Sequence, residues 1–305
     1  MLFEKGVTME GLYALVGVSR QGFHQRQQAQ RGRADEGRVL LQVAQRIRTT
    51  GKHPRMGCRE MYFFAKKHTE KYPIPFKTGR RAFEKALLEN GFRLVKKRVF
   101  HKTTVRGSFV FPNAIGGAAL WGTDMVWVSD ITYFEVWSEG KKTFFYLTVI
   151  LDVYSRRCIG WSVSLNLQTE NTSLPALEMA LETRNVRPGQ SCFGLVFHSD
   201  GGGQYSDKGF LEKLAGHKIR SSMADIVYEN PFVERFHSTL KNDYLIPWDV
   251  NSLDLLKKLT PQAAHQYNHE RPHSRLGRKT PVEFEQNLAK LPLCQRTFLT
   301  MKVVA

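Results

Sequence analysis

Short apolar runs, most of them rich in β-branched residues, recur between residues 126 and 223 and predict strands. Between them, Leu174, Leu177, Ala180 and Leu181 repeat at helical spacing and predict a helix that Thr169 caps and that ends at Thr183. Two further helices are predicted over residues 207–217 and 231–244. In chain order, the predicted strands cover residues 126–134, 143–151, 158–163, 195–199 and 219–223.

This order of elements predicts a mixed α/β domain. Three strands that pair antiparallel, followed by helix, strand, helix, strand and helix, are typical of the ribonuclease H-like fold, with a mixed five-stranded sheet. In that fold the first and fourth strands lie side by side. Asp130 in the first strand and Asp200 at the end of the fourth would then meet, an adjacency that follows from the fold and not from spacing alone.

The first 30 residues have a different pattern. Leu12, Leu15 and Val16 are spaced as on a helix, Gly17 breaks it, and Ser19 is a good N-cap for a second helix from Arg20 to Gln30. With Phe23 inward, that helix presents Arg20, Gln21, His24 and Gln25 outward. The pattern predicts a helix-turn-helix with a DNA-reading second helix, and a plain helical hairpin remains the alternative.

A polar, Gly-interrupted stretch at 31–35 is interpreted as a linker, and a second small helical unit follows it. Helices are predicted over 39–49, 57–67 and 79–89; Thr78 is expected to cap the last and Gly91 to end it. A DNA contact is predicted for the outward cations of this unit and of the basic run after it: Arg80, Arg81, Lys85, Lys96, Lys97 and Arg98.

Charge is distributed unevenly along the chain. The net charge is +17, from 45 Lys and Arg and 28 Asp and Glu. Residues 1–110 hold 24 basic and 8 acidic residues, a net of +16, and residues 111–305 hold 21 and 20, a net of +1. A basic N-terminal third beside a nearly neutral remainder is typical of a DNA-binding arm joined to a catalytic body, and a merely basic surface is the alternative.

The four cysteines are scattered and form no Cys-x-x-Cys pair, so neither a zinc site nor a disulfide framework is expected. The N-terminus lacks the apolar core of a signal peptide, and no apolar run reaches about 18 residues. We therefore expect a soluble intracellular protein without a membrane partner.

Three carboxylates carry the candidate chemistry. Asp130 lies inside an apolar strand, where an unpaired carboxylate is costly to bury; Asp200 ends another, and Glu234 lies on a helix that Asn230 caps and Pro231 starts. Carboxylates suit Mg²⁺, and two such ions roughly 4 Å apart can activate one oxygen of a phosphodiester and neutralise another. Asp152 is a rival ligand, and Asp225, Glu229 and Asp243 are alternatives to Glu234.

The surroundings of these carboxylates support the same interpretation. Three glycines, 201–203, follow Asp200 and leave room for a phosphate backbone. Glu234, His237 and Lys241 share one polar helix face, where His237 is a candidate proton donor and Lys241 a phosphate contact.

Four ordered motifs carry a family resemblance. They are Trp-Val-Ser-Asp130-Ile-Thr, His-Ser-Asp200-Gly-Gly-Gly-Gln-Tyr, Asn-Pro-Phe-Val-Glu234-Arg-Phe-His-Ser-Thr-Leu-Lys and Tyr267-Asn-His-Glu-Arg-Pro-His-Ser-Arg-Leu-Gly. The chain resembles the DDE transposases of bacterial insertion sequences, in the retroviral-integrase-like group that is encoded by two overlapping reading frames. The resemblance covers nearly the whole chain, as a downstream-frame product.

This resemblance implies that Asp130, Asp200 and Glu234 form the catalytic and metal-binding triad. It implies two Mg²⁺ ions, for which Mn²⁺ can substitute, donor cleavage at the element ends, and attack of the freed 3′-OH on another phosphodiester. It also implies double-stranded DNA as partner, dimers or larger assemblies on paired ends, work in the bacterial cytosol at the nucleoid, and fusion to or association with an upstream-frame product. The interval from Asp200 to Glu234 is about two residues shorter than the family pattern.

The C-terminal part holds a capping box, Thr280-Pro-Val-Glu283, behind a basic loop. For Arg271 and Arg275 in that loop, a DNA contact and a solvated turn are equally good interpretations. The predicted division of the chain is a helix-turn-helix segment (1–34), a second helical DNA-binding domain (35–106), a linker (107–117), the catalytic domain (118–287) and a tail (288–305).

Two other functions remain open at this stage. One is a ribonuclease H-like nuclease that does not join strands, and the other is a non-catalytic DNA-binding regulator. The sequence does not specify the DNA end that is recognised, the target or the number of subunits.

Overall fold

The computed structural model describes residues 13, 15–50, 52–75, 77–94, 111–138, 141–224 and 231–301. Contacts divide the chain into two compact units, which are described separately. The N-terminal unit comprises Met1–Lys52 and Gly57–Leu94, and the larger unit comprises His53–Met56 and Val95–Ala305.

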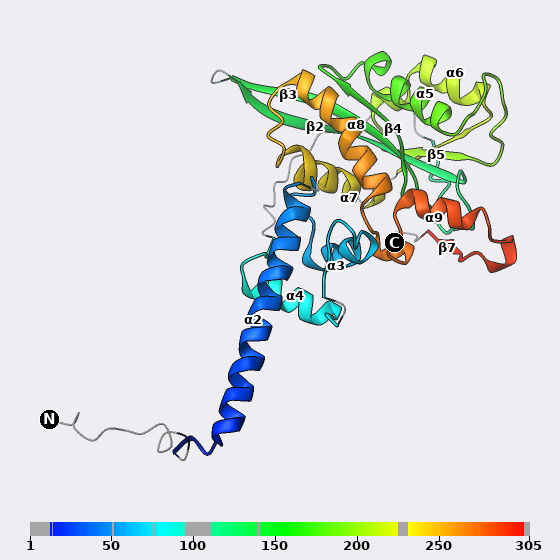
Figure 1. Ribbon diagram of the computed structural model, residues 1–305. Coiled ribbons are helices and arrows are strands. Elements are labelled where there is room, and N and C mark those ends of the chain that lie inside the picture. The colour runs from blue at the N-terminus through cyan, green and yellow to red at the C-terminus, as the bar shows by residue number, and fades with distance from the viewer. Residues whose placement is uncertain are drawn as a thin grey trace. The chain divides into compact units, whose positions relative to one another are not determined.

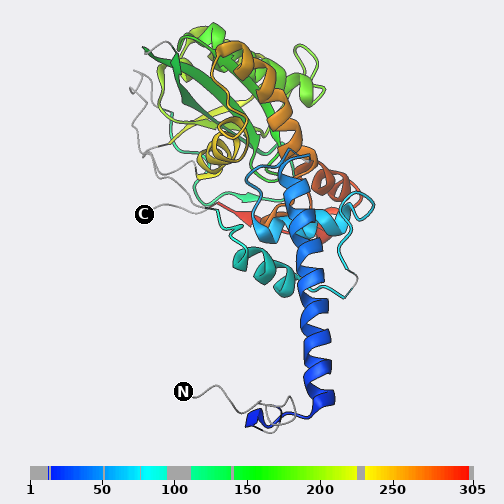
Figure 2. The same cartoon turned by 60° about the vertical axis from the view of Figure 1, so that its left-hand side comes forward.

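The N-terminal unit contains the helices α2 (Arg20–Arg48), α3 (Cys58–Lys67) and α4 (Arg80–Glu89). Ile47, Met61, Phe83 and Leu87 are among the side chains buried between them. Apolar positions of α2 are concentrated in its last two turns, so only that end packs on α3 and α4. The first half of α2 runs clear of both helices in two views (Figures 1 and 2) and is exposed along its length.

Several sequence predictions for this unit are confirmed and two are wrong. Ser19 caps α2, since its hydroxyl accepts from the amide of Gly22 at 3.1 Å. The linker expected at 31–35 is instead part of α2, because Arg, Ala, Asp and Glu are adequate helix formers and outweigh the cost of one glycine. Gly79, and not Thr78, is the N-cap of α4. The helix expected before Gly17 and the basic run 96–98 lie mostly or wholly outside the described residues.

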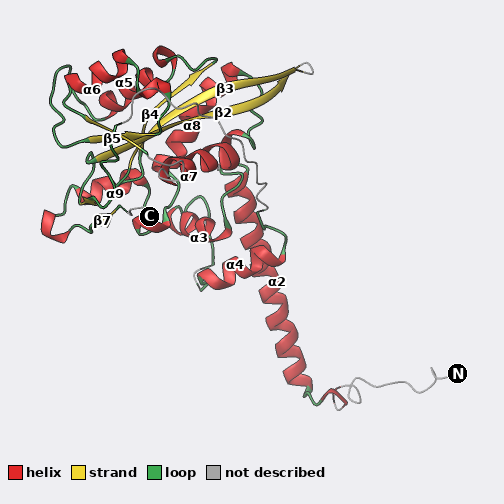
Figure 3. Cartoon of the chain, turned by 180° about the vertical axis from the view of Figure 1, so that it is seen from behind, coloured by secondary structure: helices red, strands yellow, loops and turns green. Residues whose placement is uncertain are grey.

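The larger unit is built on a mixed sheet that helices flank (Figure 3). Its strands pair in the order β4-β3-β2-β5-β6. Its strands are β2 (Val126–Ser138), β3 (Lys141–Asp152), β4 (Cys158–Ser164), β5 (Val196–Ser199) and β6 (Arg220–Met223). β2, β3 and β4 pair antiparallel, and β5 pairs parallel with both β2 and β6. This confirms the ribonuclease H-like arrangement that the element order predicts.

Two hydrophobic cores lie on opposite faces of the sheet (Figure 1) because strand side chains alternate. Val126 and Val128 pack with Val233 and Phe236 of α7 (Pro231–Thr239) and with α8 (Leu253–His269). Trp127 faces the other way, toward α5 (Ser173–Thr183) and α6 (Lys208–Gly216). Asp130 has the same parity as Val126 and Val128, so the alternation of β2 directs it to the α7 side.

Smaller elements complete this unit. A π-helical segment, Leu240–Leu245, continues α7, and α9 (Pro281–Leu288) starts at the predicted capping box. β1 (Ala119–Leu120) pairs antiparallel with β7 (Leu299–Thr300), so part of the expected C-terminal tail pairs with the start of the domain. The 3-10 turns are Thr169–Asn171, Gly203–Tyr205, Ser274–Leu276 and Leu293–Gln295. The prediction that Thr169 caps α5 is wrong: Thr169 begins one of these turns, and Thr172 occupies the N-cap position of α5.

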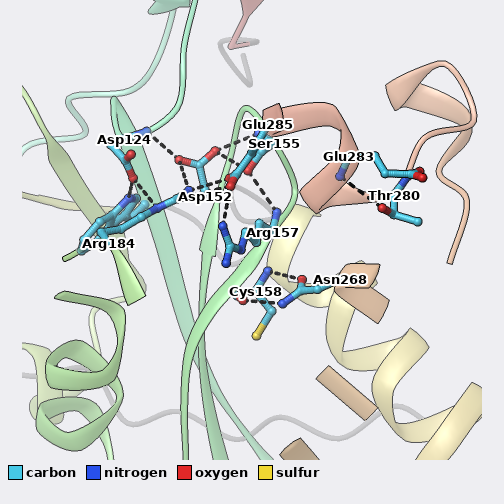
Figure 4. Close-up of polar contacts among 11 residues, drawn as sticks. Asp124, Asp152, Ser155, Arg157, Cys158, Arg184, Asn268, Thr280, Glu283 and Glu285 are labelled. Carbon is cyan, nitrogen blue, oxygen red and sulfur yellow. Dashed lines mark hydrogen bonds and ion pairs between the residues drawn. The ribbon is translucent and has the colours of Figure 1, made fainter. Parts of the chain in front are cut away.

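An ionic network links the ends of β3, α5 and α9 (Figure 4). The Arg184 guanidinium pairs with Asp124 (Nε–Oδ1, 2.7 Å), Asp152 (Nη2–Oδ2, 3.4 Å) and Glu285 (Nη2–Oε1, 2.7 Å). Asp152 is fully buried and also accepts from the amide of Asp124 and from the amide and hydroxyl of Ser155. Asp152 therefore stabilises the turn after β3, and its contacts within the protein argue against the role of rival metal ligand that the sequence leaves open.

Gly160 marks a close approach of α5 to β4. A Cβ on Gly160 would lie 2.2 Å from the carbonyl oxygen of Ala176 and 3.1 Å from the Cβ of Ala180. Gly160→Ala should therefore lower the free energy of unfolding by about 3 kcal/mol, the upper end for overpacking, because a helix backbone must move. Gly216→Ala is the matched control, since its Cβ would meet nothing within 4 Å. Equal urea midpoints for the two variants would contradict this account.

Within the described residues, no helix is long and apolar enough to cross a membrane.

Candidate active site

The parallel pairing of β2 with β5 brings two of the predicted carboxylates together. Val128 is in register with His198, and two residues further along each strand are Asp130 and Asp200. The two aspartates are close enough that the charge of Asp200 raises the pKa of Asp130. The predicted meeting of the first and fourth strands is thus observed in the fold.

The turn after Asp200 is fixed to β2 by a buried hydrogen bond. Asp200 accepts from the amide of Gly202 at 3.2 Å, and a 3-10 turn follows that carries Tyr205 back under the site. The hydroxyls of Tyr205 and Ser129 lie 2.8 Å apart, and Ser129 donates to the carbonyl of Val149. The sequence predicts no role for Tyr205, because its contact with Ser129 depends on a turn that residue spacing does not predict.

Tyr205→Phe should lower the free energy of unfolding by about 1 kcal/mol, the net value of one buried hydrogen bond. It should also slow any chemistry at Asp200, because the Tyr205–Ser129 contact fixes to β2 the turn that follows Asp200. Urea unfolding and product formation check the two effects, with Tyr146→Phe in β3 as control. An unchanged unfolding midpoint would show that the Ser129–Tyr205 contact is not made.

Glu234 lies in the first turn of α7, which packs its apolar face, Val233 and Phe236, on β2. Glu234 itself is exposed, and partial burial raises its pKa. The expected cap at Asn230 and the alternative ligands Asp225 and Glu229 fall outside the described residues. α7 therefore carries Glu234 along the same face of the sheet on which Asp130 lies.

The electrostatics of the three carboxylates favour a cation. Burial, then repulsion from Asp200 and from Glu234, raise the pKa of Asp130 well above its usual range. Carboxylates are hard oxygen donors of the kind that Mg²⁺ prefers. In the described part of the chain, no three acidic, His or Cys side chains lie close enough together to hold a metal ion; Asp130 and Asp200 are neighbours, and Glu234 is exposed on the same side of the sheet.

His237 and Lys241 lie on the face of α7 and its π-helical continuation that meets β2. The Nδ1 of His237 is 3.5 Å from Oδ2 of Asp130, and burial, with repulsion from Lys241, lowers the pKa of His237 well below its ordinary value. Lys241 donates to Thr132 Oγ1 at 2.6 Å and to the carbonyl of Tyr133, and burial lowers its pKa to about 8. Both predicted DNA contacts are thus engaged with β2 in this structure.

The remaining predicted DNA contacts are spread over both units. Arg20, Gln21 and His24 are exposed at the start of α2. On α4, Arg81 is exposed, and Arg80 and Lys85 form surface pairs with Glu84 and Glu89. Arg275 is exposed on a 3-10 turn, whereas the guanidinium of Arg271 is mostly buried and pairs with Asp243.

Comparison with known proteins places this site in a known domain type. The family model described as integrase core domain matches residues 123–227, and a second model with that description matches residues 224–281. Together they span Asp130, Asp200 and Glu234.

Individual relatives extend the similarity. The uncharacterized 31 kDa protein of insertion element IS600 from Shigella sonnei is 32% identical over 279 residues, 88% of this chain and 96% of that protein. Transposase InsF for insertion sequence IS3fB of Escherichia coli (strain K12) is 35% identical over 172 residues, 55% of this chain and 56% of InsF. Among solved structures, the HTLV-2 integrase catalytic core domain in complex with magnesium aligns with a TM-score of 0.40 and 17% identity, over 54% of this chain and 97% of that chain.

Proposed function

Because the chain belongs to the insertion-sequence transposases with an integrase core domain, we propose that it cleaves DNA at the ends of its element and joins the freed 3′-OH to another phosphodiester. The observation that supports this most directly is the placement of Asp130, Asp200 and Glu234 on one side of the sheet, where the charges of Asp200 and Glu234 raise the pKa of Asp130. This step needs a site that holds both an attacking and a leaving oxygen.

We assign Asp130, Asp200 and Glu234 as the ligands of divalent metal, two Mg²⁺ ions or Mn²⁺ in their place. Bound metal would supply charge stabilisation at the attacking and leaving oxygens. The protein's own part is to orient the carboxylates: β2 and β5 fix the two aspartates, and the exposed Glu234 closes on them. Gly203, around which a Cβ would meet nothing within 4 Å, leaves open space beside Asp200 for a DNA backbone.

His237 and Lys241 have supporting roles in this proposal. Burial lowers the pKa of His237 and so favours its neutral form, which can share a hydrogen bond with the Asp130 carboxyl group without adding a charge to the site. Lys241 adds positive charge behind Asp130 while its contacts to Thr132 and Tyr133 tie its segment to β2.

We assign DNA recognition mainly to the N-terminal unit. Arg20, Gln21 and His24 lie on a helical segment that is exposed on all sides, as an element that enters a groove must be. Arg80, Arg81 and Lys85 on α4, the basic run Lys96, Lys97 and Arg98, and Arg275 would add phosphate contacts.

The proposal extends to assembly and setting. Joining two element ends requires two active sites, so the chain is expected to work on double-stranded DNA as a dimer or larger assembly in the bacterial cytosol. Fusion to or association with an upstream-frame product would supply further end contacts.

Incubation of the purified chain with Mg²⁺ and labelled element-end duplex tests this function. Joined products are expected, and they should disappear when EDTA removes the metal. Cuts without joining would instead indicate a nuclease, and end binding without cuts would indicate a DNA-binding regulator. The same duplex with scrambled end sequence is the control for recognition.

A further inference from the structure

For Arg271 the sequence leaves two interpretations open, a DNA contact and a solvated turn, and the structure fits neither, because the side chain is mostly buried and pairs with Asp243. In the motif that begins at Tyr267, two residues before Arg271 are buried as well: Tyr267 is 5% exposed and Asn268 7% exposed. The motif lies at the end of α8 and in the loop after it, packed between β4 and the helix that carries Glu234. The side chains of Tyr267 and Asn268 therefore contact other parts of the protein and not solvent.

Asn268 fixes the end of α8 to the sheet (Figure 4). Its side-chain amide donates to the carbonyl of Cys158 at 2.8 Å and accepts from the amide of Cys158 at 2.9 Å. These two bonds replace a strand partner at the start of β4, next to the register shift at Ile150 and Leu151. The end of α8 is thus hydrogen-bonded to the edge strand β4.

From the end of α8 and the loop after it, two side chains contact α7 and the π-helical segment that continues it. The ring of Tyr267 meets that of Phe236 edge-on, with centroids 4.6 Å apart and planes at 87°. Arg271 pairs with Asp243, Nη2 to Oδ2, at 2.9 Å, and both side chains are at most 20% exposed. A buried ion pair of this kind requires defined geometry, because either charge alone would be poorly solvated.

The ion pair engages the π-helical segment that follows α7. Asp243 lies two residues beyond Lys241, so it projects from the other side of the helix. On the side of this segment that faces β2, Lys241 donates to Thr132. On the opposite side, Asp243 pairs with Arg271. π-helical turns are often found at functional sites, and here these two contacts fix the rotation of the segment about its axis.

We propose that Arg271 and Asp243 are positioning residues that set the orientation of α7 and so direct Glu234 toward Asp130 and Asp200. The inference rests on the proposed function insofar as Glu234 is a metal ligand. Among the described residues, no hydrogen bond or ion pair fixes the side chain of Glu234, so its direction depends on the helix that carries it. A small rotation of α7 would displace its carboxylate while the fold persists.

Metal binding without DNA provides the primary test. Asp243→Asn and Arg271→Gln should each raise the Mn²⁺ concentration at half-maximal thermal stabilisation by about tenfold, the lower end for residues that support metal ligands. The charge swap, Arg271→Asp with Asp243→Arg, should restore the midpoint in part. Lys257→Gln on α8 and Asp249→Asn just after the π-helical segment are exposed matched controls and should leave the midpoint unchanged.

The outcomes separate this inference from the proposed function. A lower melting temperature with an unchanged Mn²⁺ midpoint in both single variants would overturn it and show a purely structural ion pair. A strand-joining assay on the same proteins should show a fall in kcat with little change in KM for the DNA end. If the wild-type chain binds Mn²⁺ but joins no strands, the proposed function fails while the Mn²⁺ midpoints still test the positioning role.

Discussion

Asp200→Asn should abolish cleavage and joining while the folded protein and its binding to element-end DNA persist. The loss should exceed about a hundredfold, the upper end for residues that only support metal ligands. The same result is expected for Asp130→Asn and Glu234→Gln. Product formation on labelled end duplex measures the loss, and a mobility shift measures binding.

Although Asp200→Asn should lose activity, its free energy of unfolding without metal should not fall. Asp200 raises the pKa of Asp130 by repulsion, so removing its charge relieves that repulsion in metal-free protein. The variant should therefore be as stable as the wild type, or more so, without metal, but it should lose the stabilisation that Mn²⁺ confers. Asp207→Asn is unsuitable as a control because Asp207 caps α6, whereas the exposed Asp254→Asn on α8 is suitable. A variant that still joined strands at the wild-type rate would show that Asp200 is not a metal ligand.

Arg184→Met should destabilise the larger unit by about 3–5 kcal/mol, the range for breaking a buried ion pair by removing one partner. One guanidinium bridges Asp124, Asp152 and Glu285, so its loss leaves three carboxylates near one another (Figure 4). Arg184→Lys should rescue little, because a single ammonium cannot reproduce these contacts. Urea unfolding followed by tryptophan fluorescence measures this effect, since all five tryptophans lie beyond residue 120.

The loss of unfolding free energy in Arg184→Met, relative to the wild type, should depend on pH. Burial raises the pKa of Asp152 to about 6, and Arg184 lowers it, so the variant's pKa is higher still. Because the pKa of Asp152 is higher in the folded than in the unfolded state, ionised Asp152 destabilises the fold. This destabilisation disappears as the pH falls through the folded-state pKa and Asp152 becomes protonated. The difference from wild type should therefore be smaller at pH 5 than at pH 8. Arg187→Met, exposed just after α5, should show no such difference. A deficit independent of pH would mean that Asp152 is not the group left unpaired.

The sheet and the site carboxylates were predictable because they depend on local patterns. β-branched runs gave the strands and their order, and Asp130 and Asp200 stand out as polar residues in apolar strands. The capping box at Thr280 and the N-cap at Ser19 were predictable for the same reason, since their partners lie within three residues.

Contacts between distant segments were not predictable from the sequence alone. Arg184 and Glu285 are 101 residues apart, Asn268 and Cys158 110 residues apart, and nothing in the spacing links them. For Arg271 the sequence leaves a DNA contact and a solvated turn open, because basic loop residues usually face solvent and its pairing with Asp243 is not visible in the sequence. The single helix α2 shows the converse: the one glycine of the predicted linker was given too much weight against the good helix formers around it.

The central claim is that Asp130, Asp200 and Glu234 close on divalent metal at one edge of the β2–β5 pair. Anomalous diffraction from crystals soaked in MnCl₂ tests it most directly. The account predicts an anomalous peak about 2 Å from carboxylate oxygens of Asp130 and Asp200, with Glu234 turned toward it. A strong peak at other residues, with none between Asp130 and Asp200 at saturating Mn²⁺, would contradict the claim.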